Sequence, residues 1–427
     1  MKQYINKILG FSLLFSSWIH AQRPVPASKQ NQPVAITNAT IHTATGLVLQ
    51  NATLVFDQGK IVGINTSVPS NAKIIDAAGK HVYPGFILVN NSLGLVEIAA
   101  TRATVDTEES NPIVPEVRTL IAFNTDSHVI PTVRTNGVLL TQPVLSGSVF
   151  RGTSSVMNLD AWNWEDAVVA KDNVLHLSWP QVRRSTDEKR NKDLAEMRFR
   201  NLNEIKSLFV RAKSYQPNSG TKEYKLEAIK PALTGGKTIF VDVTTASDAL
   251  EVLAFAKEHQ LKKVVLLGDS QLMGALDEIK KSGFPIIVTN PHSLPPNNSS
   301  SPRIQYEFAK MVSDKGILHG LDYSARKDFS DSRNLPFLAG TTAAYGLDKE
   351  KALQSITLNL AKMLGIDQNY GSLEVGKSAT LFISDGDALD QLTNQVTHAF
   401  IDGRELDLNN HQKELYRRYK EKYDKNL

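Results

Sequence analysis

The chain of 427 residues contains no cysteine. This absence excludes a disulfide framework, a thiol nucleophile, a thiolate metal site and a lipid-modified N-terminal cysteine. It is compatible with export into an oxidising compartment, but it is not evidence for export.

Closely spaced histidines are also missing. The ten histidines are His20, His42, His81, His128, His176, His259, His292, His319, His398 and His411. No two of them stand two or four positions apart, which excludes every local histidine-pair motif, His-Glu-x-x-His included. The chain therefore does not encode a metal site that takes two imidazoles from one strand or one helical turn.

The chain has little net charge and few long apolar runs. The formal net charge is +4, and Lys2 and Lys7 contribute two of these charges from a segment that we expect to be removed. The remaining net charge, near +2, is too small to indicate binding to nucleic acid or to a membrane surface. Because no segment reaches the roughly 20 apolar residues of a spanning helix, we expect no stable membrane span after that removal.

Residues 1–21 have the pattern of a secretory signal peptide. Lys2 and Lys7 form a basic start, residues 8–18 form a short apolar stretch, and residues 19–21 form a cleavage site before Gln22. An N-terminal membrane anchor is the alternative, although the apolar stretch is short for one. The segment predicts an exported protein, periplasmic or secreted.

Both ends of the chain read as β-structure, and the middle alternates strand with helix. Residues 53–56 and 61–64 flank Asp57-Gln58-Gly59-Lys60, which predicts a hairpin. Residues 239–243, 264–267 and 285–289 are apolar strands separated by helical patterns, as in a parallel sheet. Over about 280 residues, such units predict a (β/α)8 barrel, with an open doubly wound sheet as the alternative.

Three segments carry a family resemblance. Residues 79–95 read Gly-Lys-His-Val-Tyr-Pro-Gly-Phe-Ile-Leu-Val-Asn-Asn-Ser-Leu-Gly-Leu; residues 371–379 read Gly-Ser-Leu-Glu-Val-Gly-Lys-Ser-Ala; residues 352–365 form a helical segment that ends in Leu-Gly. These segments resemble the amidohydrolase superfamily of metal-dependent hydrolases, which act on non-peptide carbon–nitrogen bonds. The resemblance covers about residues 34–406. Within it, apolar residues at helical spacing, followed by Gly365, predict a helix from Glu350 to Leu364.

The resemblance implies a (β/α)8 barrel flanked by a small β-sandwich that is built from both chain ends. The expected organisation is a signal peptide at 1–21, sandwich at 22–84, barrel at 85–368, sandwich again at 369–406 and a charged helix at 407–427. In that helix, Tyr416, Tyr419 and Tyr423 share one face. We expect this face to pack on the body, with a partner-binding helix as the alternative.

The metal ligands of the family are replaced in this chain. The family places Asp, then His-x-His, on the first barrel strand; the matching positions here are Leu88, Asn90 and Ser92. The resemblance also points to Asp242 and Asp322 as strand-end positions, with Asp322 where the catalytic aspartate belongs. Relatives bind zinc or another divalent metal, but an oxygen-only set would favour Mg²⁺ or Ca²⁺. We expect no bound cofactor.

Other residues near strand ends complete the candidate site. His292 and His319 stand near strand ends and are candidates for the pocket lining, but a lone histidine is more often structural, and we favour that interpretation for both. Residues 147–154 have the glycine spacing of a phosphate loop without its lysine, and they predict a flexible loop over the barrel mouth.

Three functions fit these patterns. The favoured one is an exported amidohydrolase-superfamily protein that has lost its metal centre and acts as a small-molecule-binding protein or as an accessory to a catalytic relative. The second is an active amidohydrolase with an unusual site around Asp242, Asp322 and pocket histidines. The third is a scaffold or interaction protein. A fold alone does not decide among them, because function depends on the site.

Overall fold

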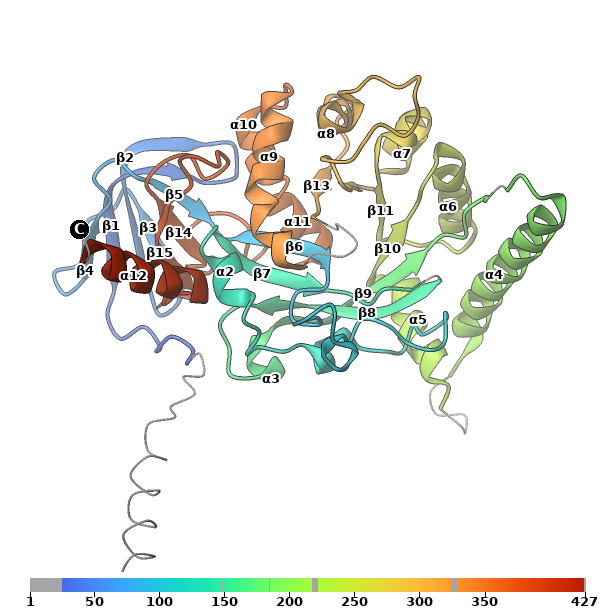
Figure 1. The fold of residues 1–427 in the computed structure, drawn as a ribbon, viewed down its shortest axis with the longest axis horizontal. Coiled ribbons are helices and arrows are strands. Elements are labelled where there is room, and N and C mark those ends of the chain that lie inside the picture. The colour runs from blue at the N-terminus through green and yellow to red at the C-terminus, as the bar shows by residue number, and fades with distance from the viewer. Residues whose placement is uncertain (1–24, 148, 184, 217–221, 324–328, 426–427) are drawn as a thin grey trace, which may run out of the picture.

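The computed structural model describes residues 25–147, 149–183, 185–216, 222–323 and 329–425 (Figure 1). The predicted signal peptide at residues 1–21 lies outside these ranges. The described chain is a mixed α/β protein built on two eight-stranded sheets. Its helices include none with the length and apolar character that crossing a membrane would require.

The first sheet joins the two ends of the chain. Its strands are β1 (Val34–His42), β2 (Val48–Asp57), β3 (Lys60–Ile64), β4 (Lys73–Asp76), β5 (His81–Pro84), β14 (Leu381–Ser384), β15 (Val396–Ile401) and β16 (Arg404–Glu405). β5 pairs with β14, and Tyr83 lies opposite Phe382. The predicted hairpin is confirmed as β2–β3, where Gln58 and Gly59 both have positive φ in the turn. The structure therefore contains the β-rich part that the resemblance implies.

The second sheet is strongly curled and carries the middle of the chain. Its strands, in spatial order, are β6 (Phe86–Asn91), β7 (Val138–Pro143), β8 (Phe150–Asn158), β9 (Val168–Ser178), β10 (Thr238–Asp242), β11 (Val264–Gly268), β12 (Ile286–Val288) and β13 (His319–Leu321). Seven strands run in one direction, but β8 is antiparallel to both neighbours. Only residues 144–149 separate β7 from β8, too few for the helical crossover that parallel strands need.

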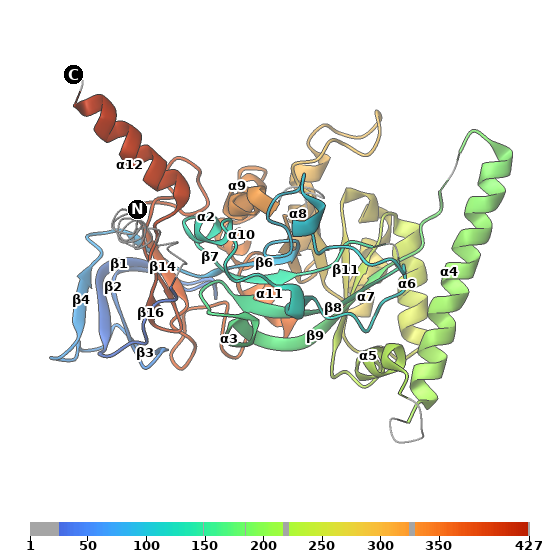
Figure 2. The same cartoon turned by 60° about the horizontal axis from the view of Figure 1, so that its bottom comes forward.

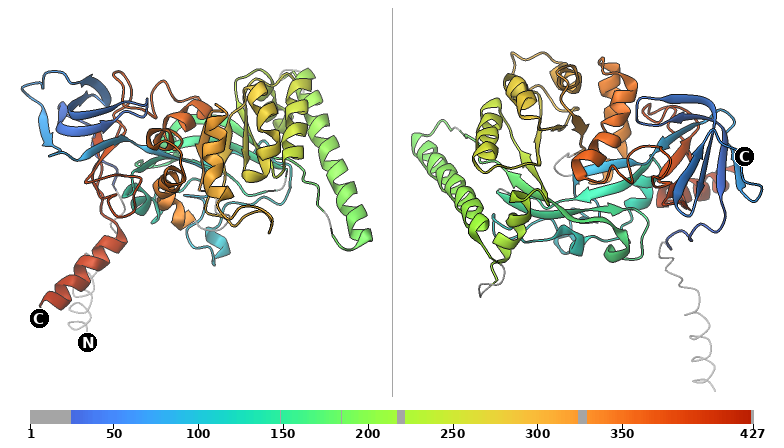
Figure 3. Two further views of the ribbon diagram at one scale, coloured as in Figure 1. Left: turned by 90° about the horizontal axis from the view of Figure 1, so that it is seen from above. Right: turned by 180° about the vertical axis from the view of Figure 1, so that it is seen from behind.

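Helices cover the outer face of the curled sheet, as Figure 1 and Figure 3 show. The helices of the described chain are α2 (Ile130–Arg134), α3 (Trp164–Ala167), α4 (Glu188–Ser214), α5 (Tyr224–Leu233), α6 (Ala246–Glu258), α7 (Leu276–Ser282), α8 (Ile304–Asp314), α9 (Leu335–Ala344), α10 (Lys349–Gln354), α11 (Leu358–Leu364) and α12 (His411–Asp424). Two of them do not belong to the outer layer: α11 packs mainly on the inner face, and α12 projects beside the β-rich sheet (Figure 2). Short 3₁₀ turns lie at Arg102–Thr104, Thr119–Ala122, Ser270–Ala275 and Phe329–Asn334. The inner face holds its own apolar cluster, which includes Ile87, Val89, Phe240 and Leu360.

The helix predicted from Glu350 to Leu364 is broken, and the break joins the two edges of the curled sheet. α10 ends at Gln354 and α11 begins at Leu358. Between them, the carbonyl of Ile356 accepts a 2.9 Å bond from the Ile87 amide of β6, and the carbonyl of Ser355 accepts a 2.9 Å bond from the Leu321 amide of β13. These carbonyls leave the helical pattern because they satisfy edge-strand amides that would otherwise lack partners.

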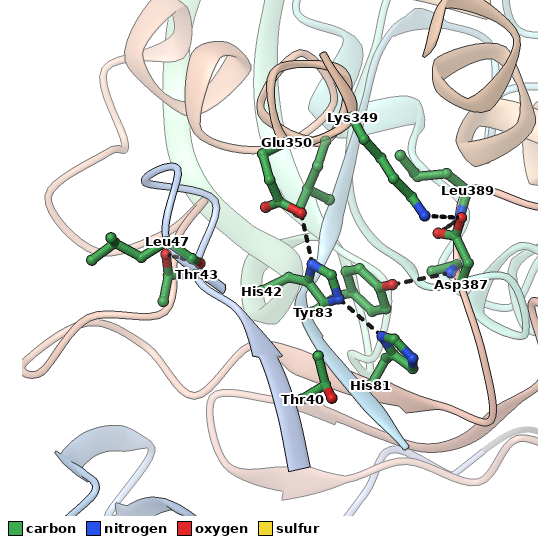
Figure 4. A network of polar contacts seen from close by, with 12 residues as sticks. Thr40, His42, Thr43, Leu47, His81, Tyr83, Lys349, Glu350, Asp387 and Leu389 are labelled. Carbon is green, nitrogen blue, oxygen red and sulfur yellow. Dashed lines mark hydrogen bonds and ion pairs between the residues drawn. The ribbon is translucent and has the colours of Figure 1, made fainter. Parts of the chain in front are cut away.

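A polar cluster links the β-rich sheet to the curled-sheet body (Figure 4). His42 lies between Glu350 and His81, with Nδ1 2.7 Å from the carboxylate and Nε2 2.9 Å from the second imidazole. The His42 ring also stacks on Tyr83, with ring centroids 4.4 Å apart. Desolvation, followed by the charge of His42, lowers the pKa of His81.

The C-terminal helix differs from its prediction. α12 buries none of its residues, and Tyr416, Tyr419 and Tyr423 are 67%, 51% and 58% exposed. Figures 2 and 3 show the helix projecting from the body beside the β-rich sheet. The expectation that these tyrosines pack on the body is wrong, because all three are exposed, and the cations over two of their rings, Arg418 over Tyr419 and Lys422 over Tyr423, belong to α12 itself.

Candidate functional site

A cavity of about 680 Å³ lies at the carboxyl ends of the parallel strands. Its lining includes residues that end or directly follow β6, β7, β9, β10, β11 and β12: residues 90–92, 144–147, 178–181, 242–244, 267–269 and 289–290. Barrel enzymes carry their active sites at this end of the sheet, where loops rather than strands set the chemistry. This cavity is therefore the candidate site.

Asn90 lies at the edge of this cavity because the end of β6 is distorted. Its φ is 51°, in the left-handed region that asparagine tolerates better than most residues, and the pairing of β6 with β7 shifts register between Leu88 and Asn91. The Asn90 amide nitrogen donates a 2.9 Å bond to Asp322. A predicted pair from opposite edges of the sheet is thus brought into contact.

Arg151 connects the two halves of the candidate site. Its guanidinium donates to Oδ1 of Asn90 at 3.2 and 3.3 Å and forms an ion pair of 2.5 Å with Asp242. Ser178 adds a 3.1 Å bond to the same Asp242 oxygen. Arg151 thus places one positive charge between Asn90 and Asp242, two positions that the family resemblance assigns to metal ligands.

Sequence reasoning missed Arg151. The prediction of a flexible loop over residues 147–154 is wrong for its second half, because β8 begins at Phe150. The antiparallel direction of β8 brings its first residues, rather than its last, to the carboxyl end of the sheet. The apolar stretches Val149-Phe150 and Val156-Met157, which flank the polar residues, were the available signal for a strand.

The remaining predicted residues are divided between the cavity and its surroundings. Ser92 is half-buried and lines the cavity. His292 is exposed and bonds Thr341 at 2.8 Å, and His319 is buried at the start of β13. Neither histidine belongs to the lining. Leu321 packs in the outer cluster, and alternation along the strand places His319 on that same outer face.

A buried polar chain, also missed from sequence, lies among the inward residues of β7, β8 and β9. Gln142 accepts the Asn90 backbone amide at 3.3 Å and donates to Ser154 at 3.0 Å. Ser154 lies 2.7 Å from Nε2 of His176. Desolvation, with the charge of Arg151 as a second cause, lowers the pKa of His176 well below its usual value. This imidazole is therefore neutral at neutral pH.

The described residues do not fit the metal that relatives bind. No three histidine, aspartate or glutamate side chains of the described chain gather where they could hold an ion. The acceptor oxygen of Asn90 and one oxygen of Asp242 are already engaged by Arg151. Asn90 also directs its amide nitrogen, which is a donor and no ligand, toward Asp322. The arrangement satisfies these oxygens with a fixed guanidinium.

The cavity is polar at its base, and part of its side wall is apolar. Its charged lining residues are Arg151, Arg183, Arg198, Asp242 and Asp269, an excess of one positive charge. Leu194 and Met197 of α4, together with Trp179, add apolar surface to the lining. Arg198 is held by both oxygens of Glu251, whereas Arg183 is exposed. The site therefore offers hydrogen-bond donors and acceptors, and two of its three arginines, Arg151 and Arg198, are already paired with carboxylates.

Comparisons with known proteins agree with the predicted family. The model of the amidohydrolase family matches residues 293–406. An amidohydrolase structure from Thermotoga maritima MSB8 is 22% identical with a TM-score of 0.76, covering 88% of this chain and 99% of that one. Phenylurea hydrolase B is 15% identical with a TM-score of 0.55, covering 88% and 97%. Molinate hydrolase is 15% identical with a TM-score of 0.53, covering 89% and 95%.

A search of curated proteins finds no match. At these identities the solved structures demonstrate a shared fold, and the family model adds sequence evidence over the C-terminal segment. The predicted resemblance is therefore confirmed: the chain carries amidohydrolase-family sequence at residues 293–406 and the fold of amidohydrolases over most of its length.

Proposed function

We propose that this protein is an exported amidohydrolase-superfamily member that has lost its metal centre and binds a small polar molecule, as a ligand-binding or accessory protein. Its curled sheet is, in this proposal, a distorted (β/α)8 barrel in which Ser355 and Ile356 complete the wall between β6 and β13. The pattern of residues 1–21 supports export.

The bridging position of Arg151 carries this proposal. An arginine is permanently charged, so its guanidinium balances Asp242 at any physiological pH without an added ion. It also accounts for the loss of imidazoles at Asn90 and Ser92. A metal ion bound by imidazoles at these positions would be a second cation beside the guanidinium, and the two charges would repel each other. The same side chain supports a site that is organised before any ligand arrives.

The cavity suits a polar ligand of modest size. A volume of about 680 Å³ lies within the range of small-molecule sites, roughly 300–1,000 Å³. Amide and hydroxyl groups in the lining, such as those of Asn90, Ser92 and Gln181, provide directional hydrogen bonds to a polar molecule. These groups fit binding better than the alternative of hydrolysis with pocket histidines, because no histidine of the described residues lines the cavity.

Replacing Arg151 by alanine tests the proposal. The change releases Oδ1 of Asn90 and one oxygen of Asp242 in the lining of the cavity, which leaves oxygen donors of the kind that hard divalent cations prefer. We expect Arg151→Ala to lose about 2 kcal/mol of unfolding free energy without metal. At Mn²⁺ concentrations about tenfold above its dissociation constant, it should regain about 1.4 kcal/mol. Chemical denaturation with and without Mn²⁺ measures both changes.

Arg183→Ala is the matched control, because it removes an exposed arginine from the same cavity. Wild type and this control should show no stabilisation by Mn²⁺. Metal analysis of the purified wild-type protein completes the test. About one tightly bound zinc or manganese ion per chain, or a loss of stability on adding a chelator, would refute a site organised by Arg151.

A further inference from the structure

The C-terminal helix α12 lacks the packing that normally keeps a short helix folded. It has 14 residues and buries none of them. Isolated helices of this length are marginal in water, and most helices gain their stability from a packed apolar face. Contacts to the body are concentrated at its first turn, where Asn410 caps Lys413 and Gln412 accepts a 3.1 Å bond from Thr132. Its remaining turns extend into solvent (Figures 2 and 3).

The side chains of α12 are sorted around its axis. At 100° per residue, Leu415, Tyr416, Tyr419 and Tyr423 fall within an arc of about 100°. Lys420 borders this arc on one side, and Arg418 and Lys422 border it on the other. The three acidic residues, Glu414, Glu421 and Asp424, lie on the opposite face. The helix therefore presents an aromatic stripe with positive charge on both sides.

This distribution selects among the surfaces that could cover the stripe. A second α12 packed against the first would place the flanking lysines and arginines of the two helices side by side, which is unfavourable. An anionic lipid surface matches both features. Tyrosine rings settle at the level of the headgroups, and the long stems of lysine and arginine let their charges reach the phosphates on either side.

We propose that α12 docks this protein on an anionic lipid surface, with Tyr416, Tyr419 and Tyr423 facing the membrane. The attachment is peripheral, because the stripe is one face of a short helix and needs no spanning segment. The flanking lysines and arginines add electrostatic attraction to anionic headgroups, which weakens as salt screens it. The aromatic stripe contributes the part of the binding that salt does not remove.

Vesicle sedimentation tests this docking. The probes are vesicles of phosphatidylglycerol mixed with phosphatidylcholine and vesicles of phosphatidylcholine alone. Each is added to the protein as purified from cells, after any processing of its N-terminus. We expect at least tenfold tighter binding to the anionic vesicles and a clear loss in 0.5 M salt. The triple variant Tyr416→Ser, Tyr419→Ser, Tyr423→Ser should bind the anionic vesicles at least tenfold more weakly.

Matched variants separate the helix from general effects. Tyr224→Ser removes a tyrosine that is 64% exposed outside α12 and should leave binding unchanged. Lys420→Glu with Lys422→Glu should abolish binding, whereas Lys189→Glu with Lys192→Glu on α4 makes the same change in net charge and should not. Because α12 buries nothing, all variants should keep the thermal stability of the wild type.

Two results would overturn the proposal. One is equal sedimentation of wild type and the triple tyrosine variant. The other is a concentration-dependent dimer, measured by light scattering, that the triple variant loses; the stripe would then belong to a second copy. Neither outcome bears on the metal content or the Arg151 test, so failure here leaves the proposed pocket function standing.

Discussion

Asn90 combines two properties that few residues supply together. Its left-handed backbone lets β6 bend at the cavity, and its amide joins Asp322 to Arg151 by donating to one and accepting from the other. A histidine at this position would place a basic imidazole, instead of the amide oxygen of asparagine, beside the Arg151 guanidinium. The residue therefore fits a site organised by an arginine rather than by a metal.

We predict different costs for Asn90→Gly and Asn90→Ala. Both variants lose the bonds to Asp322 and Arg151, but only alanine meets the steric penalty of the left-handed conformation, about 1–2 kcal/mol. The alanine variant should therefore be the less stable by about 1 kcal/mol in urea denaturation. Equal stabilities would mean that the backbone at this position relaxes when the side chain is removed.

At the scale of single elements, α4 has two unlike halves. Ile205, Leu208, Phe209 and Ala212 are buried in its second half, whereas residues 188–200 contain no buried side chain. The buried half packs against α5 and the curled sheet. The first half reaches past the cavity, and Leu194 and Met197 border it on that side.

Hydrogen exchange should therefore differ along α4. Amides in residues 192–200 should exchange substantially faster than those in residues 203–212, because local opening of the first half exposes little apolar surface. Exchange measured by mass spectrometry on peptides from each half gives the comparison, and α6 serves as a packed reference helix. Uniform protection along α4 would show that its first half is held by contacts that the described chain does not contain.

The elements that sequence could predict are those whose pattern is local. Continuous apolar runs predicted β10, β11 and β12, and Gly59 indicated the turn of the β2–β3 hairpin. β8 was missed because its centre reads Gly-Thr-Ser-Ser, a loop-like run that is tolerated because Ser154 bonds Gln142 and His176 inside the sheet. These hydrogen-bond partners lie in other strands, so the sequence around Ser154 does not reveal them.

The candidate site was predicted by position better than by chemistry. Asn90, Ser92 and Asp242 line the cavity, and Asp322 bonds Asn90, as their strand-end positions indicated. Arg151 could not be predicted as a site residue, because it reaches the cavity only through the reversed direction of β8. His319 was a candidate for the pocket because it lies near a strand end, but the alternation of the strand turns Leu321, and with it His319, to the outer face.

At the scale of the whole molecule, buried histidines make folding sensitive to acid. Burial lowers the pKa of His319 to about 4, and desolvation lowers that of His176 well below its usual value. In the unfolded chain, imidazoles accept protons near pH 6.5. The free energy of unfolding should thus fall once pH drops below about 6.5, at up to about 1.4 kcal/mol per pH unit for each buried histidine.

Urea denaturation between pH 4.5 and 8 measures this dependence. His319→Gln removes one titrating group and should reduce the acid slope, whereas His128→Gln, at an exposed position, should leave it unchanged. Stability that stays constant from pH 7 to pH 5 would contradict the neutral, buried state of these imidazoles.

The pairing of Tyr83 with Phe382 has a consequence for synthesis of the chain. The partners are about 300 residues apart in sequence, so β5 has no neighbour on that side until almost the entire polypeptide has left the ribosome. Contacts this distant are costly to form and slow folding. A nascent chain stalled after the curled sheet would display an open strand edge, which makes premature termination near residue 380 a route to aggregation rather than to a smaller working protein.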